Sequence, residues 1–376
     1  MNLSYWEYKT WFHNIDYAII GSGIVGLSCA LSLRERHPNA KIVVFESGTL
    51  PNGASTKNAG FACFGSLSEI IEDLKTHSED EVVELVRKRV MGLEILRKNL
   101  GDKKIDFQRH GGYELFTLED EALYENCLSK LSYINSVLKK ALFNEKDVFS
   151  VKNDAFSFKK VQKMLIFNQF EGQLDTGKMM HALIQKCVKK GVFVLNSFKI
   201  ESFLSKNDQI VMNFKDFGEI SAKKLCIATN GFANQLINTQ DLKPARAQVL
   251  ITKPIRNLHI KGTFHLDRGY YYFRNIDDRI LLGGGRNLDF TGETTTSLEV
   301  TSLIQNKLED LLHTTIIPNT PFEVEHRWSG IMGVGSQKKP IVMKVDDHVY
   351  CGVRLGGMGV AIGSLVGSEL ATIAQT

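Results

Sequence analysis

The first residues whose types and spacing could do chemistry are three glycines, Gly21, Gly23 and Gly26, in the pattern G-S-G-I-V-G. In this spacing the first glycine permits a tight turn, the second lets the backbone approach a pyrophosphate, and the third lets a helix pack on a strand. A helix that starts there directs free N–H groups and the positive end of its dipole at phosphates. Ser22 and Ile24, inside the motif, are predicted to share the same ligand.

An acidic residue, Glu46, follows Gly26 by 20 residues at the end of the apolar run KIVVFES. A carboxylate at this position accepts hydrogen bonds from both hydroxyls of a ribose and repels a 2′-phosphate, which disfavours NADP. Ser47 is predicted to belong to the same site. The glycine motif and the acid together indicate a bound dinucleotide, and by themselves they do not separate NAD from FAD.

The elements around these residues form a βαβ unit. Residues 16–20 and 41–47 are apolar runs that predict buried strands, and the segment between them has a helical pattern. The pattern is then interrupted twice. Helices are predicted over 69–100 and 119–141 and a strand over 105–117, while residues 245–290 alternate as an antiparallel sheet does. Further helices and strands are predicted over 178–191, 192–203, 223–231, 297–313 and 348–375.

We therefore predict an α/β fold in which a Rossmann-like βαβ domain is interleaved with an α+β domain built on an antiparallel sheet. The length of 376 residues agrees with about two domains. The nucleotide-binding domain is predicted to be discontinuous and the second domain to consist of its insertions. The predicted ranges are 1–104, 170–240 and 322–376 for the first domain, and 105–169 and 241–321 for the second.

Composition excludes several other classes. Hydrophobic residues make up 43% and charged residues 23%, which is typical of a globular chain and not of a disordered one. The net charge of +4 arises from mixed signs with no basic block, so no nucleic-acid partner is predicted. The six cysteines show no CxxC spacing, so neither a metal site nor a disulfide framework is expected. Without a secretory signal or a membrane span of about 20 residues, a cytoplasmic location is predicted.

The polar loop after Glu46 carries a family resemblance. It contains Gly53-Ala54-Ser55-Thr56-Lys57-Asn58-Ala59-Gly60. This resembles the flavin-wrapping motif, approximately G-A-S-x-R-N-G-G, of the flavin-dependent amine and amino-acid oxidoreductases, the superfamily of D-amino-acid oxidase, glycine oxidase and sarcosine oxidase. Lys57 stands where an arginine is usual. The resemblance implies FAD as cofactor, contacted by Ser55, Thr56, Lys57, Asn58, Ala59 and Gly60, and it makes the two predicted domains an FAD-binding and a substrate-binding domain.

Four further segments, spread along nearly the whole chain, resemble the same family. Residues 171–192 look like the family helix that precedes the adenine-side strand, with Thr176 in place of a proline. The strand after it places Ile200 at the adenine. A strand and turn with an A-x-G pattern lie under the ribose, and a glycine-rich start of the last helix points at the flavin pyrimidine, where its dipole stabilises negative charge. The implied contacts are Ala228, Thr229, Asn230 and Gly231, then Gly356, Gly357, Met358, Gly359 and Val360.

On the substrate side the resemblance implies a carboxylate-binding arginine and covering tyrosines. Arg354 precedes Gly356 and Gly357 of the last glycine cluster and is predicted to bind a substrate carboxylate, because a planar guanidinium matches that group. Tyr270 and Tyr272 share one face of a predicted strand with Arg274, and either is predicted to cover the substrate. The structural alternatives are that Arg354 pairs with an acid and that the aromatic face of the strand packs in the core.

Three departures from the family pattern bear on the substrate. Met332 and Gly333 stand in the family's Arg-Pro position, so an arginine is missing there or is supplied by Arg327. Sarcosine-oxidase-like members bind flavin covalently through a cysteine in this stretch, where this chain has Ser329 and Gly330, so noncovalent FAD is predicted. The lysine that activates oxygen in those members falls near Leu281.

The function implied is an FAD-dependent oxidoreductase that removes hydride from the α-carbon of a small amine or amino acid. The resulting imine hydrolyses to an oxo acid, and the flavin is reoxidised by O2 or by a quinone or other carrier, with a dehydrogenase slightly favoured. Oxidation of a 2-hydroxy acid or polyol is one alternative. A flavoprotein that acts on modified tRNA, or a redox-responsive binding module, is another. The histidines, including His265, show no metal-binding spacing, and His110 is a weak candidate for substrate contact.

Overall fold

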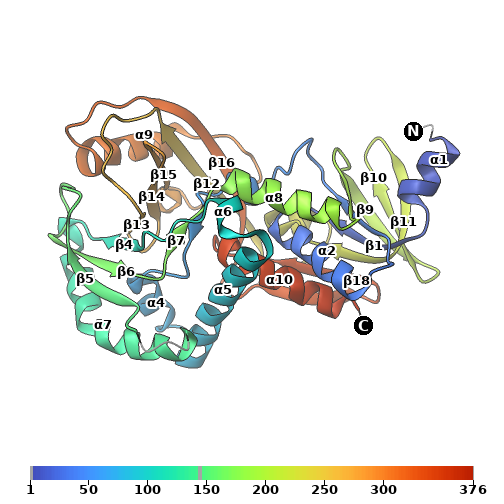
Figure 1. Cartoon of the computed structure of the whole chain (residues 1–376), viewed down its shortest axis with the longest axis horizontal. Helices are drawn as coiled ribbons and strands as arrows, with labels where there is room; N and C mark the ends of the chain where they lie inside the picture. The colour runs from blue at the N-terminus through green and yellow to red at the C-terminus, as the bar shows by residue number, and fades with distance from the viewer. Residues whose placement is uncertain (1–2, 143–145, 376) are drawn as a thin grey trace.

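The computed structural model describes residues 3–142 and 146–375, and two large sheets organise it (Figure 1). The first sheet has eight strands, in the order β17-β18-β11-β1-β2-β8, with β10 and β9 attached beside β11. Its strands are β1 (Ile15–Ile20), β2 (Ile42–Phe45), β8 (Phe193–Leu195), β9 (Ile200–Lys206), β10 (Gln209–Phe214), β11 (Gly218–Ile227), β17 (Ile341–Asp346) and β18 (Val349–Val353).

The centre of the first sheet is parallel and buried on both faces. β1 pairs in parallel with β11 and β2, and β11 pairs in parallel with β18. The residues of β2 and β18 are all buried, which explains their continuous apolar runs. α2 (Ile24–Arg36) and α10 (Gly359–Ile373) pack against each other and share one hydrophobic cluster with β1 and with α8 (Thr176–Lys189). The turns between these strands and helices therefore meet at one edge of the sheet.

The second sheet also has eight strands and is largely antiparallel, in the order β16-β12-β15-β14-β13-β4-β6-β5. α9 (Ser302–Leu311) and η5 (Leu312–Ile316) cover one cluster of its side chains, and α4 (Leu67–Asp73), α5 (Glu79–Leu100) and α7 (Glu121–Leu142) cover another. Its strands are β4 (Gly112–Leu115), β5 (Phe149–Asn153), β6 (Met164–Asn168), β12 (Lys243–Thr252), β13 (Thr263–Leu266), β14 (Tyr271–Ile276), β15 (Arg279–Gly284) and β16 (Val324–Val334).

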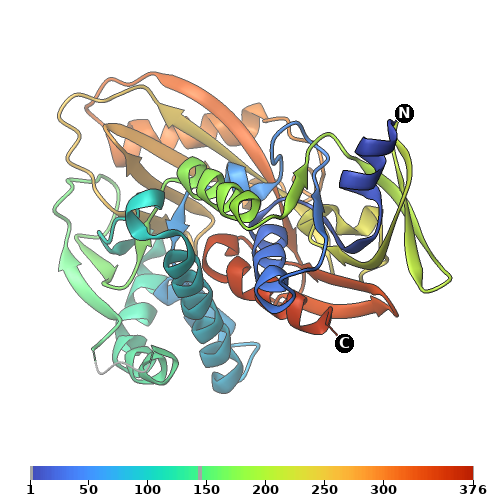
Figure 2. The same cartoon turned by 45° about the vertical axis from the view of Figure 1, so that its right-hand side comes forward.

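Helices also lie between the two sheets, where Figure 2 shows α8 beside α2 and α5. The other elements are short. β3 (Phe61–Ala62) and β7 (Gly172–Gln173) form a small sheet of their own. The remaining elements are α1 (Tyr5–Glu7), η1 (Tyr8–Phe12), α3 (Ala54–Lys57), α6 (Asp102–Ile105), η2 (Leu118–Asp120), η3 (Asn230–Gln235) and η4 (Arg286–Leu288). None of the helices in the described ranges has the length and hydropathy needed to cross a membrane.

Three predicted elements differ from the structure. β16 lies in the range 322–376 predicted for the FAD-binding domain, yet it pairs with β12 along its length and so belongs to the second sheet. The helix predicted over 69–100 is two helices, because the capping boxes of Ser66 and Ser78 each start one. Of the strand predicted over 105–117, only β4 forms. The division of the chain into two domains stays a prediction.

Candidate active site

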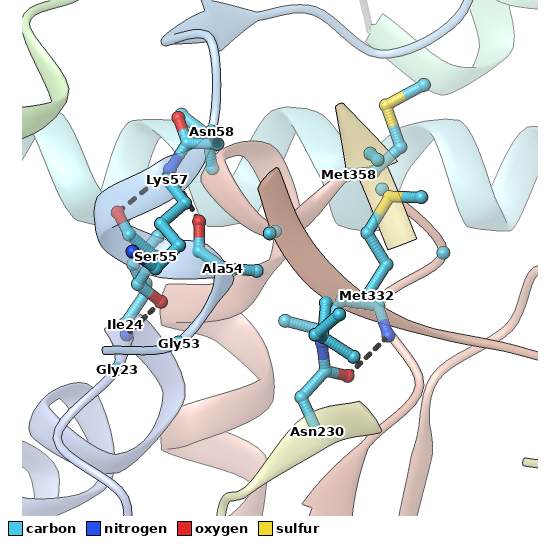
Figure 3. Close-up of a pocket in the computed structure, with 18 of the residues that line it drawn as sticks. Gly23, Ile24, Gly53, Ala54, Ser55, Lys57, Asn58, Asn230, Met332 and Met358 are labelled. Atoms are coloured by element: carbon cyan, nitrogen blue, oxygen red, sulfur yellow. Dashed lines mark hydrogen bonds between the residues drawn. The ribbon is translucent and has the colours of Figure 1, made fainter. Parts of the chain in front are cut away.

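A cavity of about 940 Å³ lies where the edge of the first sheet meets the second sheet. Its walls combine the turn after β1, the end of β2, α3, the turn after β11 and the start of α10 with residues of β12, β13 and β14. Segments more than 300 residues apart in the chain therefore face one space. Figure 3 shows part of this wall, with the Gly53–Asn58 segment on one side and Met332 and Met358 on the other.

The glycines of the first turn have the geometry that their spacing predicts. Gly21 has a φ of +101°, in the region that side chains rarely adopt, and a Cβ there would lie 2.9 Å from the carbonyl oxygen of Ala228. A Cβ on Gly26 would lie 2.0 Å from the carbonyl oxygen of Gly21, so α2 approaches β1 only because this residue is glycine. Gly23 is the N-cap of α2 and supplies no side-chain cap of its own; the Ser55 hydroxyl lies over Gly23 and caps Ile24 N–H instead.

Glu46 stands at the end of β2 and lines the cavity. One carboxylate oxygen, Oε2, accepts hydrogen bonds from the Ser22 backbone N–H at 3.1 Å and the Ser22 hydroxyl at 2.8 Å. The other, Oε1, accepts from Gly48 N–H at 3.0 Å and from the Ser47 hydroxyl at 3.3 Å. The carboxylate is thus oriented beside the glycine turn, where a ribose attached to the bound pyrophosphate would lie.

The loop that carries the flavin-motif resemblance is tied down at several points. Ser55 Oγ accepts a hydrogen bond from Ile24 N–H at 3.0 Å, which joins α3 to the start of α2 (Figure 3). Asn58 Oδ1 accepts from Gly60 N–H at 2.8 Å and from the Thr176 hydroxyl at 3.0 Å. Thr176, in place of the family's proline, therefore connects α8 to this loop. Trp328 Nε1 donates to the Lys57 carbonyl at 2.9 Å, which links the loop to β16.

Most residues predicted to bind the cofactor line this cavity. They are Gly21, Gly23, Ile24, Glu46, Ser47, Ser55, Lys57, Asn58, Ala59, Ile200, Ala228, Thr229, Asn230, Gly356, Gly357, Met358, Gly359 and Val360. The other five, Ser22, Gly26, Thr56, Gly60 and Gly231, lie behind the wall and hold it. A Cβ on Gly231, for example, would lie 2.4 Å from the Met332 carbonyl oxygen, and one on Gly60 would lie 2.3 Å from the Leu174 carbonyl oxygen.

Arg354 is the clearest correction to the predicted substrate site. Its side chain is buried and turns away from the cavity. Nη1 donates to Asp241 Oδ2 at 2.7 Å, while Nε and Nη2 donate to the Lys339 carbonyl at 3.0 and 2.8 Å. With these donors engaged, the guanidinium holds the turn before α10 and is not available to a substrate carboxylate. Arg354 is therefore an arginine that pairs with an acid, which was the structural alternative to substrate binding.

Two other candidate residues also lie elsewhere. Arg327 donates to Gln305 and Glu309, each at 2.8 Å, and does not line the cavity, so it does not replace the arginine missing at Met332. His110 is exposed and contacts Gln108 at 3.1 Å. The residue type and the position in the chain do not distinguish these two side chains from residues of the site. Their contacts in the folded protein show that they lie outside it.

Tyr270 and Tyr272 both line the cavity, next to or within β14. The ring of Tyr272 lies 5.6 Å from that of Phe61 in an edge-on contact, and burial raises the pKa of its phenol to about 12. Arg274, predicted to share their face, donates from Nη1 to the carbonyls of Gly60 and Leu174, at 3.2 and 2.9 Å. This face of β14 therefore supports the flavin-motif loop at one end and opens to the cavity at the other.

Sequence reasoning missed a buried polar cluster in the cavity wall. Cys63, Glu171 and His265 bring one donor atom each to within 4.8 Å of one another, from three distant segments. His265 Nε2 lies 3.3 Å from Glu171 Oε2, and Cys63 Sγ lies 3.9 Å from Met358 Sδ at the start of α10. Spacing along the chain could not reveal this cluster, because its members meet only through the fold, and the absence of a metal site stays a prediction. All six cysteines are free and buried.

The cavity also contains cationic side chains that sequence analysis did not single out. The Arg286 guanidinium lies 4.9 Å from the centre of the Phe290 ring, which in turn contacts Tyr270 at 5.8 Å. Arg268 pairs with Asp267 at 3.3 Å and Lys338 with Asp73 at 2.7 Å, and all three cations line the wall. Of the three, Arg286 forms no ion pair among the described residues.

The model of a protein family described as FAD dependent oxidoreductase matches residues 16–373 of this chain, almost its whole length. The chain belongs to this family. A curated relative, the probable oxidoreductase OrdL of Haemophilus influenzae, is 21% identical over 379 residues, which cover 96% of this chain and 83% of that protein. The family's cofactor is FAD, and the glycine turn at the start of α2 and the oriented Glu46 line the cavity where FAD is expected to bind.

Solved structures share the fold at low identity. Glycine oxidase from Bacillus cereus matches with a TM-score of 0.76 and 16% identity, over 96% of this chain and 97% of that one. L-proline dehydrogenase from P. horikoshii matches with a TM-score of 0.73 and 18% identity, over 96% and 93%. The mixed α/β architecture of two sheets is therefore that of the family, and the chain is an FAD-dependent oxidoreductase.

Proposed function

We propose that this enzyme oxidises a small amine or amino acid at the carbon that carries nitrogen. FAD, when bound, supplies the chemistry by accepting hydride from that carbon. The imine product hydrolyses to an oxo compound and ammonia or an amine. The observation that carries the proposal is the single cavity, in which the dinucleotide-binding turns of the first sheet face Tyr270 and Tyr272 of the second.

The residues around the substrate end would bind and orient it. The tyrosines and Met332 offer an apolar wall, which excludes water from the reacting carbon. A carboxylate on the substrate would be bound by Arg286, which lies near Tyr270 through their shared contact with Phe290. This assignment replaces Arg354. Solved proteins of the same fold include a glycine oxidase and an iminodiacetate oxidase, and substrates of that chemical class support the proposal.

The electron acceptor is proposed to be a quinone or another carrier, with O2 as the alternative. Leu281, near the position of the oxygen-activating lysine in sarcosine-type oxidases, is buried in a cluster with Ala59 and Val249. Ala59 lines the cavity, and Leu281 places an apolar side chain near the position where those oxidases have their lysine. Without a lysine at that position, negative charge that develops on oxygen lacks the stabilisation which those oxidases provide, and this favours a dehydrogenase.

Anaerobic bleaching of the flavin tests the proposed function. The holoenzyme is mixed without oxygen with glycine, sarcosine, D-alanine, L-proline and benzylamine, and with the hydroxy compounds lactate and glycerol, while the flavin absorbance is followed. Bleaching by one or more amines and not by their hydroxy analogues supports amine oxidation. Bleaching by lactate or glycerol alone would establish the hydroxy-acid or polyol alternative. If no compound bleaches, a role on modified tRNA or in redox-responsive binding becomes the better explanation.

A further inference from the structure

We propose that His265, positioned by Glu171, is the group that takes the proton from the substrate's ammonium group before the carbon is oxidised. This inference rests on the proposed amine substrate. Amines are largely protonated at neutral pH, and only the neutral amine has the lone pair that assists loss of hydride from the adjacent carbon. A proton acceptor in the cavity wall would supply that form on the enzyme.

His265 is placed by three adjacent strands. It lies on β13, where its register partners are Glu114 on β4 and Tyr272 on β14, so the three side chains form one row across the sheet. The imidazole lines the cavity, and its edge faces the ring of Phe61 at 5.3 Å. Cys63, which clusters with His265, contacts Met358 at the start of α10. The imidazole thus lies between the β14 tyrosines and the helix start predicted to face the flavin.

Glu171 orients this imidazole from behind. Its carboxylate is buried and accepts hydrogen bonds from Asn168 Nδ2 and from the Thr263 hydroxyl, both at 3.3 Å. A Cβ on Gly112 would lie 1.9 Å from Glu171 Oε2, so the carboxylate occupies space that only a glycine at that position leaves free. The contact of Oε2 with His265 Nε2 favours the tautomer whose proton is on Nε2. Nδ1, which has no hydrogen bond among the described residues, then carries the accepting lone pair.

The charged and titratable groups that face His265 favour its protonated form after the transfer. They come from α4 (Glu69), β4 (Glu114) and the segment after β6 (Glu171). Burial disfavours the imidazolium, but these three carboxylates outweigh it and raise the pKa of His265 above 6.5, nearer to that of an amine. Lys338 and Arg89 lower the pKa of Glu69 and so favour the charged form of this carboxylate.

Other groups near the cavity are poorer acceptors. Burial raises the pKa of the Cys63 thiol well above 9, and that of Tyr272 to about 12, so both stay protonated at neutral pH. Glu69 is half-buried, and Lys338 and His265 lower its pKa against the effect of desolvation, which makes it a weak base. Glu114 accepts hydrogen bonds from Ser66 and Ser68 and does not line the cavity.

The transfer step is a simple proton exchange. An N–H bond of the substrate ammonium breaks, an N–H bond forms at Nδ1 of His265, and no atom changes its oxidation state. The positive charge moves from the substrate to an imidazolium that is paired with Glu171. A deficit of neutral imidazole at low pH should therefore limit the reaction, and the acid limb of its pH profile should lie above pH 6.5.

The test follows the rate of anaerobic flavin bleaching between pH 5.5 and 9.5, with whichever of glycine, sarcosine, D-alanine, L-proline and benzylamine bleaches fastest. In Glu171→Gln the acid limb should move to lower pH by about one unit or more, because the carboxylate that stabilises the imidazolium is gone. His265→Asn should slow bleaching about 100-fold near neutral pH, and less at high pH where the free amine is abundant. His181→Asn, on the exposed face of α8, is the matched control.

A second measurement keeps this inference separate from the proposed function. Titration of histidine ring signals by NMR in the holoenzyme should give a His265 pKa above 6.5 that falls in Glu171→Gln. If no amine bleaches the flavin, the proposed function fails, but the titration still shows whether Glu171 raises the pKa of His265. An acid limb unmoved in Glu171→Gln, or a His265 signal that does not titrate between pH 5.5 and 9.5, would overturn the assignment.

Discussion

At the scale of single residues, side-chain type identified which groups could bind a carboxylate, and contacts decided which one is free to do so. Arg354 and Arg286 are both arginines close to a glycine cluster in the sequence. The first donates to Asp241 and Lys339 and is buried, while the second lines the cavity over an aromatic ring. A guanidinium whose donors are already used gains little from a new partner. The two residues therefore have opposite expected effects on substrate binding and on stability.

Replacement of Arg354 by Gln should lower stability and leave substrate binding unchanged. Removal of hydrogen bonds to a charged group costs about 1.5–3 kcal/mol each, reduced here because Asp241 is partly exposed. We expect a lower midpoint in thermal unfolding and a KM for a carboxylate substrate within about twofold of the parent enzyme. A KM raised tenfold or more, at unchanged stability, would return the anchoring role to Arg354.

Replacement of Arg286 by Gln should raise KM for substrates that carry a carboxylate. The loss of a charge-assisted contact of about 1.5–3 kcal/mol corresponds to roughly a 10- to 100-fold weaker binding. The unfolding midpoint should change little, because the guanidinium is half-buried and in no ion pair among the described residues. Arg256→Gln, at an exposed position, is the control. An equal effect on a substrate amine without a carboxylate would argue against this role.

At the scale of elements, the site depends on how closely a helix can approach a strand. α2 lies against β1 because Gly26 has no Cβ, and α3 is fastened to α2 through Ser55. The spacing of the glycines predicted this turn without any knowledge of the fold. In contrast, the placement of β16 in the second sheet required the pairing with β12 to be seen, since an apolar strand carries no mark of its partner.

Replacement of Gly26 by Ala should separate α2 from β1. Its Cβ would lie 2.0 Å from the Gly21 carbonyl oxygen, so the backbone must shift. Overpacking of this kind costs typically 1–3 kcal/mol, and the displaced glycine turn should also bind FAD more weakly. For the unfolding midpoint Gly53→Ala is a matched control, because a Cβ there meets nothing within 4 Å and the φ of −84° suits alanine. Equal unfolding midpoints in the two variants, or an FAD content in Gly26→Ala equal to that of the parent enzyme, would contradict this account.

At the scale of the whole molecule, the cavity is built by contacts between both sheets. Segments around Gly21, Glu46, Asn230 and Gly356 come from the first sheet, and Tyr272 comes from the second. A ligand that bridges them stabilises the folded chain, because the unfolded chain has no such site. The cofactor is therefore expected to contribute to the stability of the fold as well as to its chemistry.

Purified holoenzyme should be yellow and release FAD on denaturation, and removal of FAD should lower its stability. With free FAD at 100 times its Kd, the stabilisation is about 2.7 kcal/mol, and it should rise with further FAD. Thermal unfolding of holoenzyme and apoenzyme, at several FAD concentrations, measures this. A colourless protein that cannot be reconstituted, or an unfolding midpoint independent of FAD, would contradict it. Flavin that remains with the chain after denaturation would contradict noncovalent binding.

The sequence by itself determined the dinucleotide turn, Glu46, the flavin-motif loop and the α/β class. These features depend on local rules, namely glycine geometry, strand and helix periodicity, and motif spacing within a few dozen residues. Only the tertiary structure decided that Arg354 is paired with Asp241, that Arg286 faces the cavity, and that Glu171 lies behind His265. The physical reason is that a side chain's role depends on its partners, and partners that are 94 or more residues apart in sequence meet only through the tertiary fold.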